Sequence, residues 1–355
     1  MTDSLIAWAD SARAGAFGAW LQASTPTHGL LPETLQLASA DASFRRYFRI
    51  CTADGASCII MDAPPAQENC QPFVQVAALM AEAGLNAPRV LAWDQPQGFM
   101  LLSDLGAQTM LDVIAQQPEA NKTQRAYTLY RDAVDALISW QLASRPDVLP
   151  AYDEALLSRE LALFPDWYVA KHRSITLDAA AQATLDKAFA QIKASNLQSL
   201  NGARVYVHRD FMPRNLMLDS NGQLGILDFQ DAVYGPITYD IASLMRDAFI
   251  SWPEDFVLEI TVRYWEQARK AGLPVGDDFG EFYRAVEWMG LQRHLKILGI
   301  FARLTLRDGK PKYLADTPRF INYARSTCAR YRQLGPLMVL LDQIEGNETR
   351  VGYTF

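Results

Sequence analysis

The chain has 355 residues, with 33 Lys or Arg against 40 Asp or Glu, and hence a formal net charge of −7. This acidic balance argues against a general nucleic-acid binder, which needs a basic surface. No apolar run approaches the roughly 18–20 residues of a membrane-spanning helix, and the N-terminus lacks the regions of a signal peptide. The four cysteines show no metal-binding spacing. We expect them to be reduced thiols, as is usual in cytoplasmic proteins. We therefore predict a cytoplasmic protein with no nucleic-acid, membrane or obligate protein partner.

The first third of the sequence predicts one helix followed by a small sheet. Apolar residues recur at helical spacing over the first thirty residues, with Asp3 or Ser4 as the expected helix cap. Short segments rich in β-branched and aromatic residues then alternate with turn signals, and a helical stretch at 73–84 interrupts them. The expected strands lie at 31–39, 43–50, 57–64, 88–94 and 98–106. Three strands, a helix and two strands indicate a five-stranded antiparallel lobe.

The remainder of the chain is mostly helical. Helical periodicity is present at 124–144, 154–172, 178–194, 238–250, 256–271, 279–300 and 315–343. The segment 204–231 breaks this series, because short apolar pieces around a Ser-Asn-Gly turn predict a β hairpin. We predict an α+β fold with two lobes, a smaller N-terminal lobe at 1–105 and a larger helical lobe at 106–355.

The hairpin segment carries the clearest chemical pattern in the chain. His208 and Asp210 are followed by Asn215, and Asp228 stands further on before a phenylalanine. This is the catalytic-loop pattern H-R-D-x4-N with a later D-F that is typical of phosphotransferring enzymes. The oxygens of Asn215 and Asp228 can hold Mg²⁺, and Asp210 can orient an attacking hydroxyl and accept its proton. Each residue alone could instead be a turn residue, a cap or a strand-end carboxylate, and we expect a structural role for His208.

The segments 208–218 and 225–244 resemble the aminoglycoside phosphotransferase and choline kinase group of small-molecule kinases. The resemblance implies a bilobal protein-kinase-like fold, ATP and Mg²⁺ as cofactors, and support of the catalytic loop by Asp240. With ASFRRYFRI, CIIMDAPP and LLSDLG upstream, the fuller pattern is similar to that of bacterial cell-wall-recycling kinases. Those kinases phosphorylate the anomeric C1 hydroxyl of N-acetylmuramate and N-acetylglucosamine. The resemblance therefore implies a small amino-sugar substrate, an α-1-phosphate product and a role in peptidoglycan recycling.

The expected nucleotide site departs from the kinase pattern in its covering loop. Protein kinases cover the phosphates with a glycine-rich loop, but residues 36–54 contain no glycine. We expect the small residues at 39–43, including Ser43, to form the phosphate-covering turn instead. The backbone of LLSDLG, where the lobes would join, is expected to meet adenine, and a plain strand-to-helix turn is the alternative. The residues expected nearest to adenine are Ser103, Asp104 and Leu105.

The strand lysine of the kinase pattern is also absent. The first 121 residues contain no lysine, and Met61 stands at the expected position. The candidate replacements are the arginines of the second expected strand, Arg45, Arg46 and Arg49, any of which could instead be a solvent-facing charge. Strand alternation places Arg46 on the opposite face from the other two. The glutamate that pairs with the lysine in kinases would be Glu68 or Glu82.

The acceptor pocket is expected in the helical lobe. A glutamine follows the D-F pair and no A-P-E motif occurs, so a protein substrate is not expected. N-acetylmuramate carries a carboxylate, which a cation would bind. The candidate substrate residues are Arg214, Tyr234, Arg246 and Arg293. Further candidates, each as readily a core or surface residue, are Trp252, Trp288, His294, Glu160, Asp166 and Trp167.

Two other functions are compatible with the sequence. A kinase of choline, an aminoglycoside or a homoserine-like alcohol would keep the fold, and its cationic acceptor could use the carboxylates of Asp231 and Asp247. A nucleotide-binding regulator without activity would account for the missing lysine and glycine loop. The intact set of Asp210, Asn215 and Asp228 argues against such a regulator, because it has no need of both a base and metal ligands.

Overall fold

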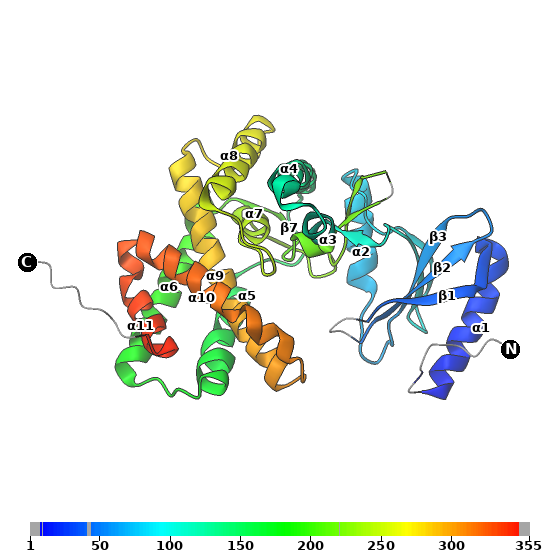
Figure 1. Ribbon diagram of the computed structural model, residues 1–355, viewed down its shortest axis with the longest axis horizontal. Helices are drawn as coiled ribbons and strands as arrows, with labels where there is room; N and C mark the ends of the chain where they lie inside the picture. The colour runs from blue at the N-terminus through cyan, green and yellow to red at the C-terminus, as the bar shows by residue number, and fades with distance from the viewer. Residues whose placement is uncertain (1–7, 9, 41–43, 220, 348–355) are drawn as a thin grey trace, which may run out of the picture. The chain divides into compact units, whose positions relative to one another are not determined.

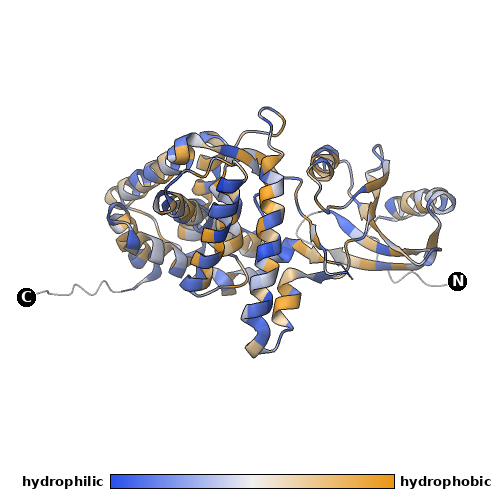
Figure 2. Ribbon diagram, turned by 90° about the horizontal axis from the view of Figure 1, so that it is seen from above, coloured by the Kyte–Doolittle hydropathy of each residue, from blue (hydrophilic) through white to orange (hydrophobic). Residues whose placement is uncertain are grey.

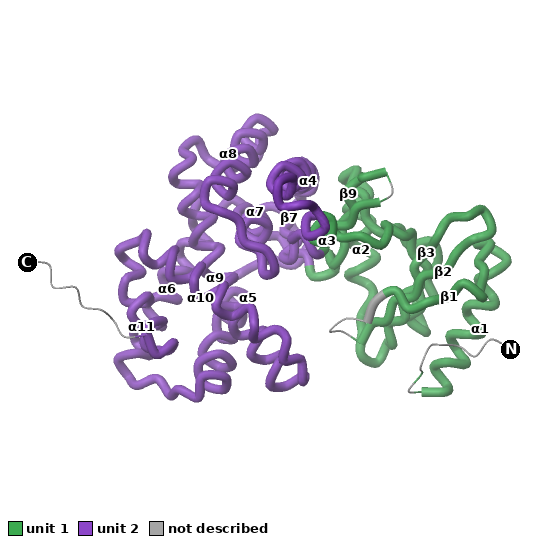
Figure 3. The backbone as a smooth tube through the Cα atoms, in the orientation of Figure 1, with its two compact units in different colours: residues 1–113, 215–231 green, residues 114–214, 232–355 purple. Residues whose placement is uncertain are grey.

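The computed structural model describes residues 8, 10–40, 44–219 and 221–347. The chain divides into two compact units, unit 1 with residues 1–113 and 215–231 and unit 2 with 114–214 and 232–355 (Figure 3). Unit 1 thus extends beyond the predicted boundary at residue 105 and includes a second, later segment of the chain. The reason is backbone pairing: β6 (Gln108–Thr109) forms an antiparallel ladder with β8 (Leu216–Leu218), which in turn pairs with β9 (Leu224–Ile226).

A five-stranded antiparallel sheet forms the body of unit 1 (Figure 1). Its strands lie in the order β1-β2-β3-β5-β4. Their bounds are Leu30–Ala40 for β1, Arg46–Thr52 for β2, Ser57–Asp62 for β3, Val90–Asp94 for β4 and Phe99–Ser103 for β5. Helix α2 (Gln71–Glu82) connects β3 to β4. The five predicted strands and the helix between them are confirmed.

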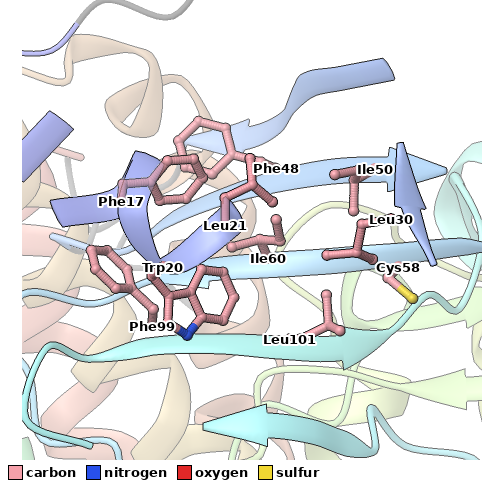
Figure 4. Close-up of a cluster of buried hydrophobic side chains, with 10 residues drawn as sticks. All are labelled: Phe17, Trp20, Leu21, Leu30, Phe48, Ile50, Cys58, Ile60, Phe99 and Leu101. Carbon is pink, nitrogen blue, oxygen red and sulfur yellow. The ribbon is translucent and has the colours of Figure 1, made fainter. Parts of the chain in front are cut away.

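Helix α1 (Ser11–His28) covers one face of this sheet. Figure 4 shows Phe17 and Trp20 of the helix packed with Phe48 of β2 in a buried apolar cluster. Because side chains alternate along a strand, Tyr47 and its i+2 neighbours lie on the other face of the sheet. The helix cap is Asp10, whose carboxylate accepts the N–H of residue 12 at 2.8 Å. The predicted caps at positions 3 and 4 lie outside the described residues.

Unit 2 is mainly helical, as predicted, and holds one two-stranded ladder of β7 (Arg204–Val207) and β10 (Val233–Pro236). Its larger helices are α4 (Glu119–Leu142), α5 (Glu154–Leu163), α6 (Ala179–Gly202), α7 (Thr238–Met245), α8 (Glu254–Lys270), α9 (Phe279–Leu306), α10 (Thr317–Arg330) and α11 (Gly335–Glu345). Within the described part of the chain, none of the helices has the length and apolar composition needed to cross a bilayer.

Two predicted helices of unit 2 are divided in the structure. The segment predicted at 154–172 forms α5 and then a π-helix at Phe164–His172, where Pro165 has no N–H to continue the α-helical ladder. The segment predicted at 315–343 forms α10 and α11, with a short 3₁₀ turn between them. Gly335 and the proline after it begin α11, which fits the preference of proline for the first turn of a helix.

Helix α9 packs unusually closely on the end of α5. A Cβ atom added to Gly299 would lie 2.3 Å from the carbonyl carbon of Leu163, so only glycine permits this approach. Figure 2 shows hydrophilic and hydrophobic residues intermixed along the helices of unit 2. Several polar side chains of α9 are buried, among them Gln292, Arg293 and Lys296. Since buried charges need partners, this packing brings together the ionic network described below.

Candidate active site

Asp210 lies in the loop that follows β7, and hydrogen bonds with buried side chains hold the backbone of this loop. Asp240, in the first turn of α7, is fully buried and accepts the N–H of His208 at 2.7 Å and the N–H of Arg209 at 2.9 Å. The Nδ1 atom of the buried His208 accepts the N–H of Asp210 at 3.2 Å. Arg209 has φ of 76°, a left-handed conformation that only a well-supported loop retains in a non-glycine residue. The loop therefore presents Asp210 in a defined position.

A buried arginine completes the support of this loop. The guanidinium of Arg293 donates to the carbonyl oxygen of Arg209 at 2.6 Å and lies 4.8 Å from the ring centroid of Tyr239. Burial raises the pKa of Asp240 to about 7, although the two N–H donors and Arg293 favour its ionised form. Arg293, predicted as a substrate residue, is thus engaged with the catalytic loop.

A carboxylate that the sequence left open forms the centre of a buried network under the same loop. Glu160 of α5 is 5% exposed, and its Oε1 accepts from Arg209 Nη2 at 2.5 Å and from Lys296 Nζ at 2.7 Å. Its Oε2 accepts from the Tyr152 hydroxyl at 2.7 Å and from Gln292 Nε2 at 2.9 Å. Burial opposes ionisation of Glu160, but the two cations outweigh it and lower the pKa to about 2. The network ties two helices to the residue before Asp210.

The expected metal ligands belong to unit 1. Asn215 Nδ2 donates to Asp228 Oδ2 at 3.3 Å, and the carbonyl of Asn215 accepts the N–H of Leu227 at 2.9 Å. Asp228 has φ of 64°, again a left-handed conformation at a non-glycine residue. The ring of Phe229 lies 4.9 Å from that of Phe73 on α2. The hairpin thus places the carboxylate beside the amide and anchors it to α2.

The donor set of this pair fits a hard divalent cation. Mg²⁺ prefers oxygen, and proteins usually hold it through one or two carboxylates together with substrate phosphates and water. Asn215 and Asp228 provide one amide oxygen and one carboxylate. No group of three or more His, Cys, Asp or Glu that could hold a metal occurs among the residues the structure describes. The other ligands of such an ion would be phosphate oxygens and water.

The side chains of residues 103–105, the segment predicted to meet adenine, form contacts within unit 1. The carboxylate of Asp104 is 4% exposed and accepts from Arg49 Nε at 2.6 Å, from Arg49 Nη2 at 3.0 Å and from the Ser57 hydroxyl at 2.7 Å. The Ser103 hydroxyl accepts the N–H of Arg89 at 2.9 Å, and Leu105 is buried. The predicted contact of this segment's backbone with adenine, nearest to these three residues, stays a prediction.

Two further ATP candidates have different outcomes. Arg46 lies on the face of the sheet that α1 covers, where its guanidinium is 3.8 Å from the ring centroid of Trp8 and donates to Asp62 Oδ2 at 2.5 Å. This face is opposite to that of Tyr47, so the predicted ATP contact of Arg46 does not fit the structure. Ser43 lies outside the described residues.

The family model of the phosphotransferase enzyme family matches residues 34–278 of the chain. The chain belongs to this family. It is 49% identical over 337 residues to the N-acetylmuramate/N-acetylglucosamine kinase of Pseudomonas aeruginosa, covering 95% of each chain. It is 47% identical over 341 residues to the kinase of the same name of Neisseria meningitidis serogroup B, covering 95% of this chain and 97% of that one.

Solved structures of other kinases share the fold of this phosphotransferase. Choline kinase LicA from Streptococcus pneumoniae superimposes with a TM-score of 0.61 at 12% identity, covering 88% of this chain and 99% of that one. The kinase-like fold that the resemblance implied is therefore confirmed, as is the resemblance to this group of small-molecule phosphotransferases.

The predicted acceptor residues of the phosphotransferase are dispersed among different contacts. Arg246 donates to Glu254 at 2.6 Å and its guanidinium lies 5.7 Å from the Tyr323 ring centroid. The Arg214 guanidinium lies 5.1 Å from the ring centroid of Phe249. Tyr234 belongs to β10 and pairs with Tyr206 of β7. The other aromatic and polar candidates, Trp252, Trp288, His294, Asp166 and Trp167, are placed on the helices of unit 2 or the segments flanking them.

Of the two carboxylates proposed for a cationic acceptor, that of Asp247 is engaged in a turn of its own backbone. Asp247 is almost fully buried and its Oδ2 accepts the N–H groups of Phe249 and Ile250 at 2.8 and 2.9 Å. These bonds form the turn that ends α7 earlier than predicted. Burial raises the pKa of Asp247 to about 6, against the lowering effect of those N–H donors. A cavity of about 440 Å³ nearby includes only Trp252 of the acceptor candidates, so we do not assign it to the acceptor.

Replacing Asp104 with alanine is expected to lower the free energy of unfolding by about 3 kcal/mol, because it leaves the partly buried Arg49 without its carboxylate. Urea unfolding followed by circular dichroism measures this change. The matched variant Ser57→Ala removes one donor to the same carboxylate and should cost about 1 kcal/mol. Equal stability of the Asp104→Ala variant and the wild type would show that the pair does not support the fold.

Proposed function

We propose that this phosphotransferase is a cytoplasmic ATP-dependent kinase acting on the anomeric C1 hydroxyl of N-acetylmuramate and N-acetylglucosamine. The product would be the α-1-phosphate, and the role would lie in peptidoglycan recycling. The observation that carries the proposal is the 47–49% identity, over nearly the whole chain, to kinases that bear these two sugars in their name. The alternatives of a cationic acceptor and of an inactive regulator have no comparable support.

In this proposal Asp210 accepts the proton of the acceptor hydroxyl. An anomeric hydroxyl is more acidic than an ordinary alcohol, so a carboxylate is a sufficient base. Asp240 and His208 hold the backbone on which this carboxylate stands, and they do so before substrate arrives, which is the condition for efficient positioning. In phosphoryl transfer, the protein contributes mainly such positioning and the stabilisation of charge.

Asn215 and Asp228 would hold Mg²⁺, which supplies neutralising charge to the phosphates of ATP when it is bound. The left-handed conformation of Asp228 and the contact of the next ring with α2 keep its carboxylate beside Asn215. The carboxylate can then serve as a ligand without a large rearrangement of its own hairpin.

The test is an ADP-release assay with Mg²⁺ and ATP. The acceptor panel contains N-acetylmuramate, N-acetylglucosamine, their methyl glycosides blocked at C1, choline, kanamycin and water alone. Turnover is expected on the two free sugars and is expected to fall to the level of water on the methyl glycosides. Turnover on choline or kanamycin but not on the sugars would overturn the proposed acceptor and leave the family assignment intact.

A further inference from the structure

The structure offers a replacement for the missing strand lysine. Met61 of β3 lies directly opposite Tyr47 of β2 in the antiparallel register. The residue two positions before Tyr47 is Arg45, which directly precedes β2, and its guanidinium interacts with the Tyr47 side chain through a hydrogen bond. A cation from the neighbouring strand thus approaches the place where a lysine at position 61 would stand.

Arg45 forms a buried ion pair with Glu68. The arginine is 8% exposed, and its Nε donates to Glu68 Oε2 at 3.0 Å. The other oxygen of Glu68 accepts the N–H of Phe44 at 3.2 Å. Kinases orient their lysine by a glutamate in the corresponding way. Here the glutamate lies just before α2, and the same carboxylate also fixes the backbone next to the arginine.

The Arg45–Glu68 pair and the expected metal ligand Asp228, both in unit 1, act on the same tyrosine. Burial raises the pKa of Tyr47, the Arg45 cation lowers it, and the negative charges of Asp228 and Glu68 raise it further. Tyr47 therefore experiences both the Arg45–Glu68 pair and the Asp228 carboxylate. A cation and a metal ligand that act on one triphosphate have to be neighbours of this kind.

The two other arginines of β2 have different partners. Arg46 is paired with Asp62 on the face that α1 covers. Arg49, in the middle of the strand, is bound through two nitrogens to Asp104. Arg45 instead pairs with Glu68, which lies just before α2, the helix that also contacts Phe229.

We propose that Arg45, oriented by Glu68, binds the α- and β-phosphates of ATP in place of the strand lysine. The inference rests on the proposed function only in taking ATP as the donor. A guanidinium is charged at every relevant pH and matches phosphate oxygens with two parallel N–H groups, so it needs no further activation. Glu68 is then a positioning residue that acts through Arg45.

Calorimetric titration of the full-length protein with Mg²⁺-ADP and with adenosine tests this assignment. Arg45→Met is expected to raise the Kd of ADP about 10- to 100-fold, because charge-assisted hydrogen bonds to phosphate are lost. Its Kd for adenosine, which has no phosphate, should stay within about twofold of the wild type. Glu68→Gln should raise the Kd of ADP less than Arg45→Met does. Arg46→Met, on the same strand but the opposite face, should leave both constants unchanged.

Restoration of the cation provides a second measurement. Adding Met61→Lys to Arg45→Met should recover a large part of the ADP affinity, because it returns a positive charge to the kinase position. Should Arg45→Met fail to fold, as judged by thermal melting, Arg45→Gln, which is polar but carries no charge, and Glu68→Gln carry the same comparison of ADP with adenosine.

Unchanged ADP affinity in folded Arg45 variants would overturn the assignment. An equal loss of ADP and adenosine affinity would also overturn it, because it would show a structural role for the pair. The titrations contain no sugar, so they remain informative even if the acceptor panel shows no turnover on the amino sugars. Conversely, turnover on the sugars with unchanged ADP binding in Arg45→Met would uphold the proposed function and refute only this inference.

Discussion

Replacing Asp210 with asparagine is expected to lower kcat on N-acetylglucosamine by about 10²- to 10⁴-fold, the usual contribution of a general base. The amide keeps the size of the side chain but cannot accept the proton of the acceptor hydroxyl. The loop contacts to Asp240 involve backbone N–H groups of the two preceding residues, so they should survive the change. Steady-state kinetics at saturating ATP and sugar measure kcat, and calorimetry should find ADP affinity within about twofold of the wild type.

Asp186→Asn is a suitable control for this variant. It makes the same chemical change in unit 2, at an exposed position of α6, and should leave kcat unchanged. A loss of less than about tenfold in Asp210→Asn would contradict a role for Asp210 as the base. If the Asp210→Asn protein still performs its function in cells, the alternative of a nucleotide-binding regulator would be favoured instead.

Replacing Glu160 with alanine is expected to lower the free energy of unfolding by about 3–5 kcal/mol, the usual cost of removing one partner of a buried ion pair. Lys296 and Arg209 would remain buried without their shared carboxylate, and Tyr152 and Gln292 would each lose an acceptor. Chemical denaturation measures the change. Because Arg209 stands next to Asp210, the folded fraction should also show a lower kcat.

The same helix provides the control. Glu154 of α5 forms an exposed ion pair with Lys193, its side chain being 68% exposed, and Glu154→Ala should cost at most about 1 kcal/mol. Similar stability losses in the Glu154 and Glu160 variants would refute a special role for the buried network.

The network also predicts a pH dependence with a definite sign. The pKa of Glu160 is lowered to about 2 in the folded protein, so its ionised form stabilises the fold. This contribution is fully present above the ordinary glutamate pKa of about 4.5 and is lost as the pH falls toward 2. The Glu160→Gln variant should lack this component, so its stability difference from the wild type should shrink as the pH is lowered below about 4.5. A difference that does not change with pH would contradict the assigned ionisation.

Local patterns were sufficient for the architecture. Alternating and helical periodicities placed the five strands, α2 and most helices, because these periods reflect which side of an element is buried. The catalytic-loop pattern was equally local: His208, Asp210 and Asn215 occupy one short segment, and their spacing is set by the loop they form. Their roles in catalysis stay predictions.

Pairings between distant segments were decided by tertiary structure alone. Glu160 and Lys296 are 136 positions apart, and no periodicity relates them; they meet because Gly299 permits close packing of α9 on α5. Arg45, Arg46 and Arg49 were candidates for one role in the sequence. The folded structure pairs each of them with a different carboxylate. The sequence by itself thus determined which elements form and which residues carry the phosphotransfer pattern. Only the fold decided which buried charges neutralise each other, because that depends on distances set by packing and not on chain neighbours.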